Sequence, residues 1–436
     1  MRAGAAAALI LAAGACAERE PILPGAREAV VPEAGLAVLA VAASDTEGAA
    51  PLALPAPQRL AAWPLRVFDA RNDPPHASLA AAPALRWSAA VGEGDSRRQI
   101  ITADPVSDGG RLFAMDARAR VTAVSTGGAA IWSRDLVPGW DRASDASGGG
   151  LAVVGGTLYA STGFGELHAL DAATGRTRWV QRLDAPITTP KPVGGTVFVT
   201  SRDSRAWAID AGDGRVRWET QGIPAGSVTT AAPAPALDGR LAVFPFGSGQ
   251  LVAALQDSGL RLWDSAVIGQ RSGVAYGDIG DITGDPVIRG GRVFAGTTAG
   301  RTVALDLGTG ERLWTALEGA VSPLAAVGGA LFQVTDRGQL IRLDAATGDV
   351  TWRADLPFYK DARAAKREGI FAHYGPVLAG GRLWVASSDG ALRGFDPVSG
   401  ALRTALPVPG GAASRPIAFG DALYVVGREG QLHAFR

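Results

Sequence analysis

Cysteine is nearly absent from this sequence, whose 436 residues include only Cys16. One cysteine cannot form a disulfide within the chain. It also cannot build a Cys-x-x-Cys redox motif, a haem attachment site of the Cys-x-x-Cys-His type or a thiolate zinc site. These kinds of redox and metal chemistry are therefore excluded.

An excess of charge of one sign is also lacking. The 42 lysine and arginine residues balance 42 aspartate and glutamate residues, so the formal net charge is zero. This balance argues against a nucleic-acid partner and against a basic membrane-binding surface. Glycine, in contrast, is abundant: the 58 glycines are close to twice the usual share of about 7%. That abundance predicts many tight turns rather than long helices.

The first residues have the pattern of a secretory signal. Arg2 supplies a positive charge, Ala5–Leu11 is apolar, and small residues precede Cys16. We predict a signal peptide over residues 1–15, which is too short to span a bilayer. A cysteine directly after the small residues resembles a bacterial lipoprotein signal, which implies lipidation of Cys16. Ala17, rather than aspartate, implies sorting to the outer membrane. An ordinary signal peptide is the alternative.

An Ala/Pro-rich stretch follows. Its composition over residues 16–84 predicts a tether and arm rather than part of a core, and the lipoprotein resemblance implies that this tether is lipidated. The apolar run 36–43 is too short for a transmembrane helix but long enough for a strand laid on the next domain. The sequence leaves open whether the arm packs against that domain.

One phrase then recurs along the chain. Ala169–Trp179 reads A-L-D-x-x-T-G-x-x-x-W, and it returns at Ala304–Trp314, at Arg342–Trp352 and in altered form at Ala208–Trp218. A repeat of this length predicts similar units that bury their apolar faces against one another.

Each unit reads as four short strands joined by turns. In the unit that ends at Trp179, Gly155-Gly156 suits a two-residue hairpin turn and residues 166–171 alternate polar with apolar. The carboxylate of Asp171 can accept backbone N–H groups in the next turn, and Gly175 is free to take a positive φ. The predicted strands of this unit are 151–154, 157–162, 166–171 and 176–180.

Eight glycine-containing turns of the first kind predict eight units. The last unit lacks a fourth strand, and residues 85–87 supply an unpaired one, so pairing them would close a ring without open edges. We predict an all-β fold over residues 85–436, an eight-bladed β-propeller of four-stranded antiparallel blades, closed by an N-terminal strand around Trp87. The turns are Gly109-Gly110, Gly155-Gly156, Gly194-Gly195, Asp238-Gly239, Gly290-Gly291, Gly328-Gly329, Gly380-Gly381 and Gly420-Asp421.

Seven tryptophans end the fourth strands. Ligand stacking is one interpretation, but their regular placement favours packing between blades, with each indole N–H bonded to a backbone carbonyl. These tryptophans are Trp87, Trp132, Trp179, Trp218, Trp263, Trp314 and Trp352.

This repeat resembles that of two propeller families, the quinone-cofactor (PQQ) dehydrogenases and the BamB lipoproteins of the outer-membrane β-barrel assembly machine. The dehydrogenases carry an adjacent Cys–Cys disulfide and need calcium with carboxylate ligands. This chain has no cysteine after Cys16, and its densest acidic stretch, Asp278–Asp285, does not follow the calcium-loop pattern. The resemblance therefore favours BamB and implies a non-enzymatic protein without cofactor or metal. A PQQ-binding propeller or dehydrogenase remnant, and a module of another envelope complex, are the alternatives.

The BamB resemblance also implies partner residues. Asp281 matches the first acidic position of the family's contact with the POTRA domains of BamA, Thr283 holds the second, and Asp285 is a nearby carboxylate. The family's other contact falls near Ala225–Val228. The resemblance implies binding to BamA, and to unfolded outer-membrane proteins, on the periplasmic face of the outer membrane. From the residues alone, Asp278–Asp285 can be a solvated loop, a metal site or a partner contact.

Overall fold

Short strands and tight turns make up the fold. Every regular element among the residues that the structure describes is a strand. Cys16, the predicted signal peptide over 1–15, the apolar run 36–43 and Asp278 lie outside these residues. Within them, no helix has the length and apolar character needed to cross a membrane. The computed structural model describes residues 51–145, 148–229, 233–269, 271, 279–361, 363 and 366–436.

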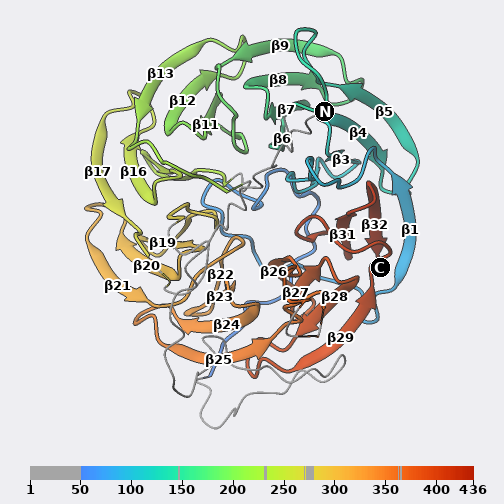
Figure 1. The fold of residues 1–436 in the computed structure, drawn as a ribbon, viewed down its shortest axis with the longest axis vertical. Helices are drawn as coiled ribbons and strands as arrows, with labels where there is room; N and C mark the ends of the chain where they lie inside the picture. Colours follow the sequence, from blue (N-terminus) through green and yellow to red (C-terminus); the bar gives the residue numbers. More distant parts are fainter. Residues whose placement is uncertain are drawn as a thin grey trace, which may run out of the picture. The chain divides into compact units, whose positions relative to one another are not determined.

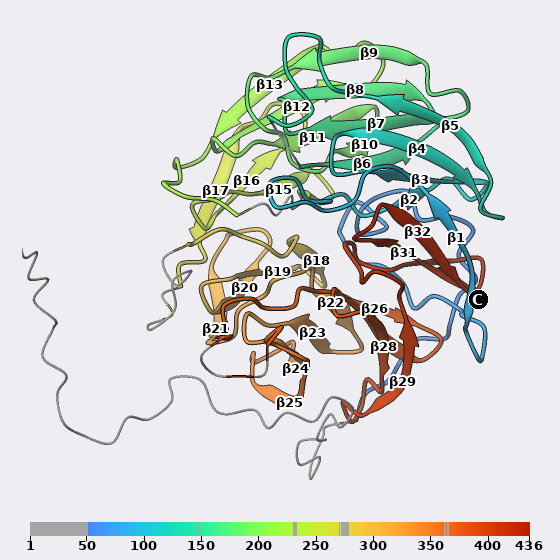
Figure 2. The same ribbon diagram turned by 45° about the vertical axis from the view of Figure 1, so that its right-hand side comes forward.

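The strands form eight antiparallel sheets of four strands each, arranged as blades around a ring (Figure 1). The turned view in Figure 2 shows neighbouring sheets packed side by side. The predicted eight-bladed β-propeller is thus confirmed.

The first four blades follow one another along the chain. Blade 1 is β2 (Val106–Ser107), β3 (Arg111–Met115), β4 (Arg120–Ser125) and β5 (Ala130–Asp135). Blade 2 is β6 (Gly149–Val154), β7 (Thr157–Thr162), β8 (Glu166–Asp171) and β9 (Thr177–Arg182). Blade 3 is β10 (Lys191–Val193), β11 (Thr196–Thr200), β12 (Arg205–Asp210) and β13 (Val216–Gln221). Blade 4 is β14 (Ala236–Asp238), β15 (Leu241–Pro245), β16 (Gln250–Leu255) and β17 (Arg261–Ala266).

The other blades repeat this order. Blade 5 is β18 (Val287–Arg289), β19 (Arg292–Thr297), β20 (Arg301–Asp306) and β21 (Arg312–Ala316). Blade 6 is β22 (Ala325–Val327), β23 (Ala330–Val334), β24 (Gln339–Asp344) and β25 (Val350–Asp355). Blade 7 is β26 (His373–Ala379), β27 (Arg382–Ser387), β28 (Ala391–Phe395) and β29 (Leu402–Pro407). Blade 8 is β30 (Ile417–Phe419), β31 (Ala422–Gly427), β32 (Gln431–Phe435) and, from the start of the ring, β1 (Leu85–Ala90).

The ring closes through β1, as predicted. β1 pairs antiparallel with β32, and Trp87 lies opposite Ala434 in the register. Every blade therefore has four strands, and β32 is paired on both sides and no longer stands at the edge of its sheet.

The strand order divides the turns between two faces of the ring. In a four-stranded antiparallel meander, the turn between strands one and two and the turn between strands three and four lie at one end. The turn between strands two and three lies at the other end, together with the connection to the next blade. We call this second end the connection face.

Each blade-ending tryptophan is fixed by a glycine and a carbonyl of the next blade. Gly348 has a φ of +81°, and a Cβ placed on it would lie 2.6 Å from Cε3 of Trp314. Only glycine lets the turn come this close while it adopts this backbone conformation. The seven indole N–H groups donate to the backbone oxygens of Thr126, Ala172, Ala211, Gln256, Leu307, Ala345 and Pro397, in the order of the tryptophans along the chain.

The arm is not a free tether where the structure describes it. Residues 51–84 run across the middle of the ring (Figure 1), and Trp63 is fully buried. Ser107 of β2 exchanges two backbone hydrogen bonds with Trp63, and the N–H groups of Val153 and Ile288 donate to other arm carbonyls. The arm thus takes up donors on the inner edges of several innermost strands. This part of residues 16–84 belongs to the core of the ring, contrary to the expectation from its composition.

Candidate functional site at the axis and the connection face

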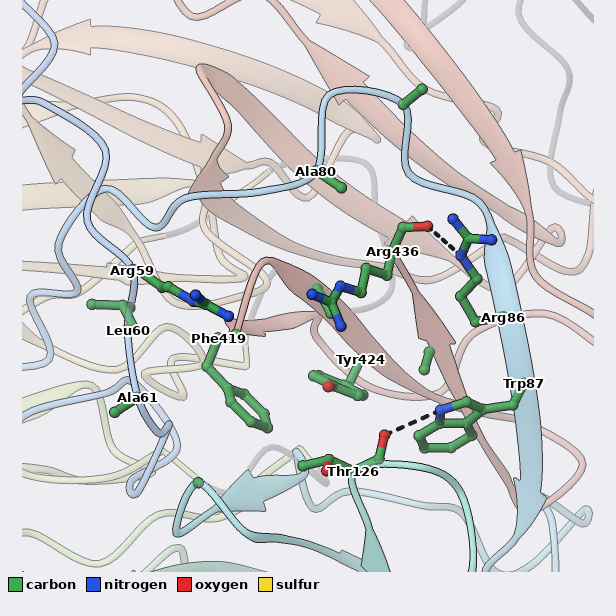
Figure 3. A pocket seen from close by; sticks show the side chains of 15 residues that line it. Arg59, Leu60, Ala61, Ala80, Arg86, Trp87, Thr126, Phe419, Tyr424 and Arg436 are labelled. Atoms are coloured by element: carbon green, nitrogen blue, oxygen red, sulfur yellow. Dashed lines mark hydrogen bonds between the residues drawn. The ribbon is translucent and has the colours of Figure 1, made fainter.

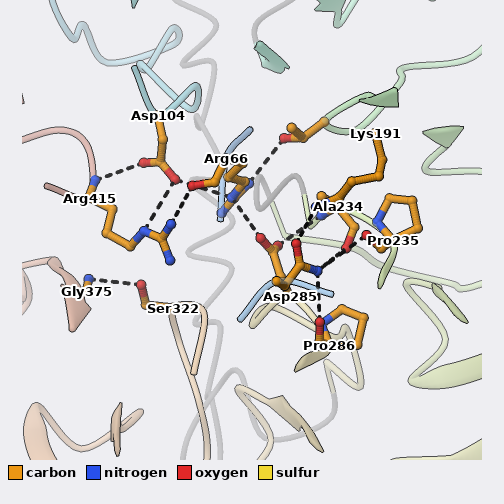
Figure 4. Close-up of polar contacts among 12 residues, drawn as sticks. Arg66, Asp104, Lys191, Ala234, Pro235, Asp285, Pro286, Ser322, Gly375 and Arg415 are labelled. Carbon is orange, nitrogen blue, oxygen red and sulfur yellow. Dashed lines mark hydrogen bonds and ion pairs between the residues drawn. The ribbon is translucent and has the colours of Figure 1, made fainter. Parts of the chain in front are cut away.

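Arg66 of the arm lies within a buried cluster of charged side chains, where the innermost strands converge (Figure 4). Its Nε is 3.3 Å from Oδ2 of Asp104, just before β2, and 3.2 Å from Oδ2 of Asp285, just before β18. Arg415, just before β30, donates its backbone N–H to Asp104 over 2.8 Å and its guanidinium to the carbonyl of Arg66. The arm therefore joins blades 1, 5 and 8 through charges.

Lys191 of β10 extends this cluster to blade 3. Its Nζ donates to the carbonyl of Asp69 over 2.9 Å and to Oδ1 of Asn72. Burial lowers the pKa of Lys191 to about 8, although Asp285 and Asp69 oppose the shift. Burial likewise raises the pKa of Asp285, against the opposing charges of Arg66, Arg415 and Lys191.

This axial cluster, which we call the clasp, attaches the arm to the blades through ion pairs and hydrogen bonds. Asp104 and Asp285 already face guanidinium groups, so a calcium ion here would have to displace ion pairs to gain ligands. In the described part of the chain, no three histidine, cysteine, aspartate or glutamate residues are placed to hold a metal ion together. The residues present fit the binding of the arm and do not fit a calcium–quinone site.

The three residues predicted to contact a partner are buried. Asp285 belongs to the axial cluster and also accepts the backbone N–H of Ala234 over 3.0 Å. Thr283 donates its hydroxyl to the carbonyl of Ala320. Asp281 accepts two hydrogen bonds from Thr229 in another connection of the ring. None of the three side chains is presented to solvent, so a partner could not touch them directly in this conformation.

Asp281 joins two connections between blades. Its Oδ2 accepts the backbone N–H and the hydroxyl of Thr229, over 2.8 and 2.6 Å. Arg202, in the turn after β11, donates to the carbonyl of the same threonine. Burial raises the pKa of Asp281, and the hydrogen bonds from Thr229 oppose that shift. Ala225–Val228, the other region implied as a contact, directly precedes Thr229. The structure therefore brings the two implied regions together, and the contact between them is made by the buried side chain of Asp281.

Large apolar side chains are exposed on the connection face near these loops. Ile223 follows β13 and is 61% exposed, Ile268 follows β17 and is 69% exposed, and Leu317 follows β21 and is 64% exposed. Ile223 and Ile268 lie five residues after the tryptophans of blades 3 and 4, and Leu317 lies three residues after that of blade 5. All three stand in connections that leave fourth strands of consecutive blades, so they share the connection face, where single exposed residues would need no explanation.

The ring and its repeat define a β-propeller of the PQQ-repeat class. A sequence model described as outer membrane protein assembly factor BamB matches residues 117–354, more than half of the chain. The chain therefore belongs to the BamB family.

Curated relatives agree with this assignment. Outer membrane protein assembly factor BamB of Salmonella typhimurium is 33% identical over 245 residues, and that of Escherichia coli K12 is 34% identical over 249 residues. Each match covers 55% of this chain and 62% of the relative. The matched part thus spans less than two thirds of the length of these relatives.

Solved structures share the fold. BamB from Moraxella catarrhalis superposes with a TM-score of 0.66 at 17% identity, over 81% of this chain and all of that chain. Quinohemoprotein alcohol dehydrogenase from Comamonas testosteroni reaches the same TM-score at 16% identity, over 87% of this chain and 81% of that chain. At such identities the likeness concerns the fold alone.

Sequence reasoning missed the arm residues at the axis. Their signal was the run Trp63–Phe68 (WPLRVF), which is apolar and aromatic inside a stretch otherwise rich in alanine and proline. The exposed Ile223 and Ile268 had no sequence signal, because an isoleucine in a connection is equally compatible with burial.

Proposed function

We propose that this chain is a non-enzymatic scaffold of the outer-membrane β-barrel assembly machine. A lipid on Cys16 holds it at the periplasmic face of the outer membrane, where it binds the POTRA domains of BamA and assists the insertion of barrel proteins. Membership of the BamB family supports this function. The axial cluster argues against the quinone-cofactor alternative, since charged side chains and the arm occupy the centre of the ring.

The observation that carries the proposal is the presence of three exposed large apolar side chains on the connection face, in the connections after three consecutive blades. Ile223, Ile268 and Leu317 offer a partner a large apolar contact area, and desolvated apolar anchors provide much of the binding energy of protein interfaces. Asp281 and Asp285 contribute indirectly. Both lie in the connection that also carries Ile268, and both accept backbone hydrogen bonds from the connection that carries Ile223.

The test mixes the purified chain, without residues 1–16, with the POTRA domains of BamA from the same organism. The double variant Ile223→Asp/Ile268→Asp should weaken binding by about tenfold or more, because it places charges in an apolar contact. Leu260→Asp is the matched control, because Leu260 is also 60% exposed but lies in the turn between β16 and β17, at the other end of the blade. It should bind like the unmodified chain.

Two results separate the function from the site. No association at high micromolar concentrations would overturn the proposed BamA binding. Equal binding by the double variant and by Leu260→Asp would leave the function standing and overturn the connection face as the contact.

A separate experiment tests the lipid anchor. Cys16→Ser in the full chain should move the protein from the membrane fraction to the soluble periplasm, and retention in the membrane would refute the anchor.

A further inference from the structure

A cavity of 870 Å³ opens at the seam between blade 8 and blade 1 (Figure 3). A smaller one of 340 Å³ lies at the corresponding seam between blades 2 and 3. The corresponding pairs Tyr159 and Tyr424, and Arg178 and Arg86, line the two cavities. The larger one falls within the range of about 300–1,000 Å³ that is usual for small-molecule sites.

An arginine–aspartate pair recurs in blades 2, 3 and 7. In each, the arginine just before the position of the blade tryptophan pairs with the aspartate that begins the turn between strands three and four. The distance is 2.9 Å for Arg178 and Asp171, and 2.6 Å for Arg217 and Asp210. Blade 7 has the same pair at 3.1 Å, formed by Arg403 and Asp396.

Blade 8 keeps the arginine of this pair but has a base in place of the acid. The register that pairs Trp87 with Ala434 corresponds to that of Trp179 with Ala169, so Arg436 stands where blade 2 has Asp171. Arg86, the counterpart of Arg178, donates instead to the backbone oxygen of Arg436 over 2.7 Å. No residue lining this cavity, all of them in the described part of the chain, carries a carboxylate side chain.

The rest of the cavity combines positive charge with aromatic surface. Arg59 of the arm reaches the rim, where it also pairs with Asp421 at 3.1 Å. The rings of Phe419 and Tyr424 stack with centroids 4.8 Å apart, and the ring of Trp87 is 6.1 Å from that of Tyr424. Guanidinium groups suit carboxylate and phosphate oxygens, while aromatic rings suit a flat apolar group.

We propose that this seam cavity binds a small organic anion. Its carboxylate or phosphate meets the guanidinium groups of Arg436, Arg59 and Arg86, and its apolar or aromatic part lies against Phe419 and Tyr424. The site is independent of the proposed BamA contact, which lies on the connection face, so either can fail without the other.

Calorimetric titration of the purified propeller tests this site with four probes. Phenyl phosphate and benzoate supply both an anionic group and a ring, inorganic phosphate supplies the charge alone, and benzyl alcohol supplies the ring alone. We expect the two aromatic anions to bind more tightly than phosphate, and benzyl alcohol not to bind. The tighter of the two aromatic anions identifies the natural anionic group as phosphate or carboxylate.

The matched variant is Arg436→Asp, which introduces the aspartate that blades 2, 3 and 7 have at this position and gives Arg86 an acidic side-chain partner. It should weaken phenyl phosphate binding by about tenfold or more, as expected when a charged hydrogen bond is lost and a repulsive charge is added. Arg59→Ala should weaken binding without altering the strand pairing, and it keeps the test valid if Arg436→Asp does not fold. Arg178→Ala, at the seam between blades 2 and 3, should leave binding unchanged.

Three results would overturn the site. They are no binding of either aromatic anion at millimolar concentration, equal binding of benzyl alcohol and phenyl phosphate, and unchanged binding in both Arg436→Asp and Arg59→Ala. Weakening by Arg178→Ala to the same extent would also overturn it, because binding would then lie at another seam.

Discussion

The contact between Trp314 and Gly348 allows the packing between blades to be measured as a coupling energy. Trp314 lies in the middle of β21 and is 9% exposed, and its Nε1 is 3.1 Å from the carbonyl oxygen of Ala345 in the next blade. Trp314→Ala should lower the free energy of unfolding by about 3–5 kcal/mol, the usual range for a large-to-small change in a core.

Gly348→Ala should destabilise the chain for two separate reasons. The φ of +81° disfavours a residue with a Cβ by about 1–2 kcal/mol. The new methyl group would also overlap the indole, since its ideal position is 2.6 Å from Cε3 of Trp314, and overpacking of this kind adds about 1–3 kcal/mol. Gly329→Ala isolates the first effect, because Gly329 has a φ of +84° and no atom lies within 4 Å of the position that its added methyl group would take.

Urea denaturation of the single and double variants gives the coupling. In the Trp314→Ala background the overlap is gone, so Gly348→Ala should cost only about as much as Gly329→Ala, which leaves a coupling of about 1–3 kcal/mol. If Gly348→Ala costs the same with tryptophan and with alanine at position 314, the glycine does not serve the contact with the indole. An unchanged unfolding midpoint for Trp314→Ala would refute the packing role altogether.

Three further predictions concern buried polar groups. Arg66→Ala leaves Asp285 without its closest cation and should destabilise the chain by about 3–5 kcal/mol in urea unfolding, whereas a change below about 1 kcal/mol would mean that the clasp is not needed. Asp281→Ala should speed amide hydrogen exchange at Thr229 and its neighbours, and unchanged exchange would show that these connections hold without it. Burial lowers the pKa of His373 to about 4, so its contribution to stability is complete above pH 6.5 and is lost as the pH falls towards 4. His373→Gln should flatten the pH dependence of the unfolding free energy in that window, and an identical slope would contradict the assignment.

The ring could be predicted from the sequence because its determinants are local and repeated. A Gly-Gly pair such as Gly155-Gly156 fixes a hairpin turn by itself, with φ values of +57° and +73°. The Asp171 turn and Trp179 recur at fixed spacing. A strand boundary that is ambiguous in one unit can therefore be placed by comparison with the others. Closure through β1 also followed from counting strands, since one fourth strand was missing and one was left over.

The arm and the site could not be predicted in the same way, because they depend on contacts between distant parts of the chain. Arg66 finds Asp104, Asp285 and the backbone of blade 8 only when the ring has assembled. The composition of the arm gave no sign of this packing, because a segment without a core of its own can still be packed into that of a neighbour. For Asp281, the spacing in the sequence placed a carboxylate in a connection and gave no information on which way it points.

The position of the arm decides where this propeller can bind other molecules. The N–H groups of Leu237 and Ile288, on the inner edges of blades 4 and 5, already donate to arm carbonyls over 2.8 and 2.9 Å. A ligand on the axis would have to replace these backbone bonds and also separate buried ion pairs, and breaking such a pair costs about 3–5 kcal/mol. Binding at the connection face or at the seam beside Arg436 requires neither. In this chain the centre of the ring therefore holds the arm, and both of the proposed binding sites lie away from the axis, where neither cost arises.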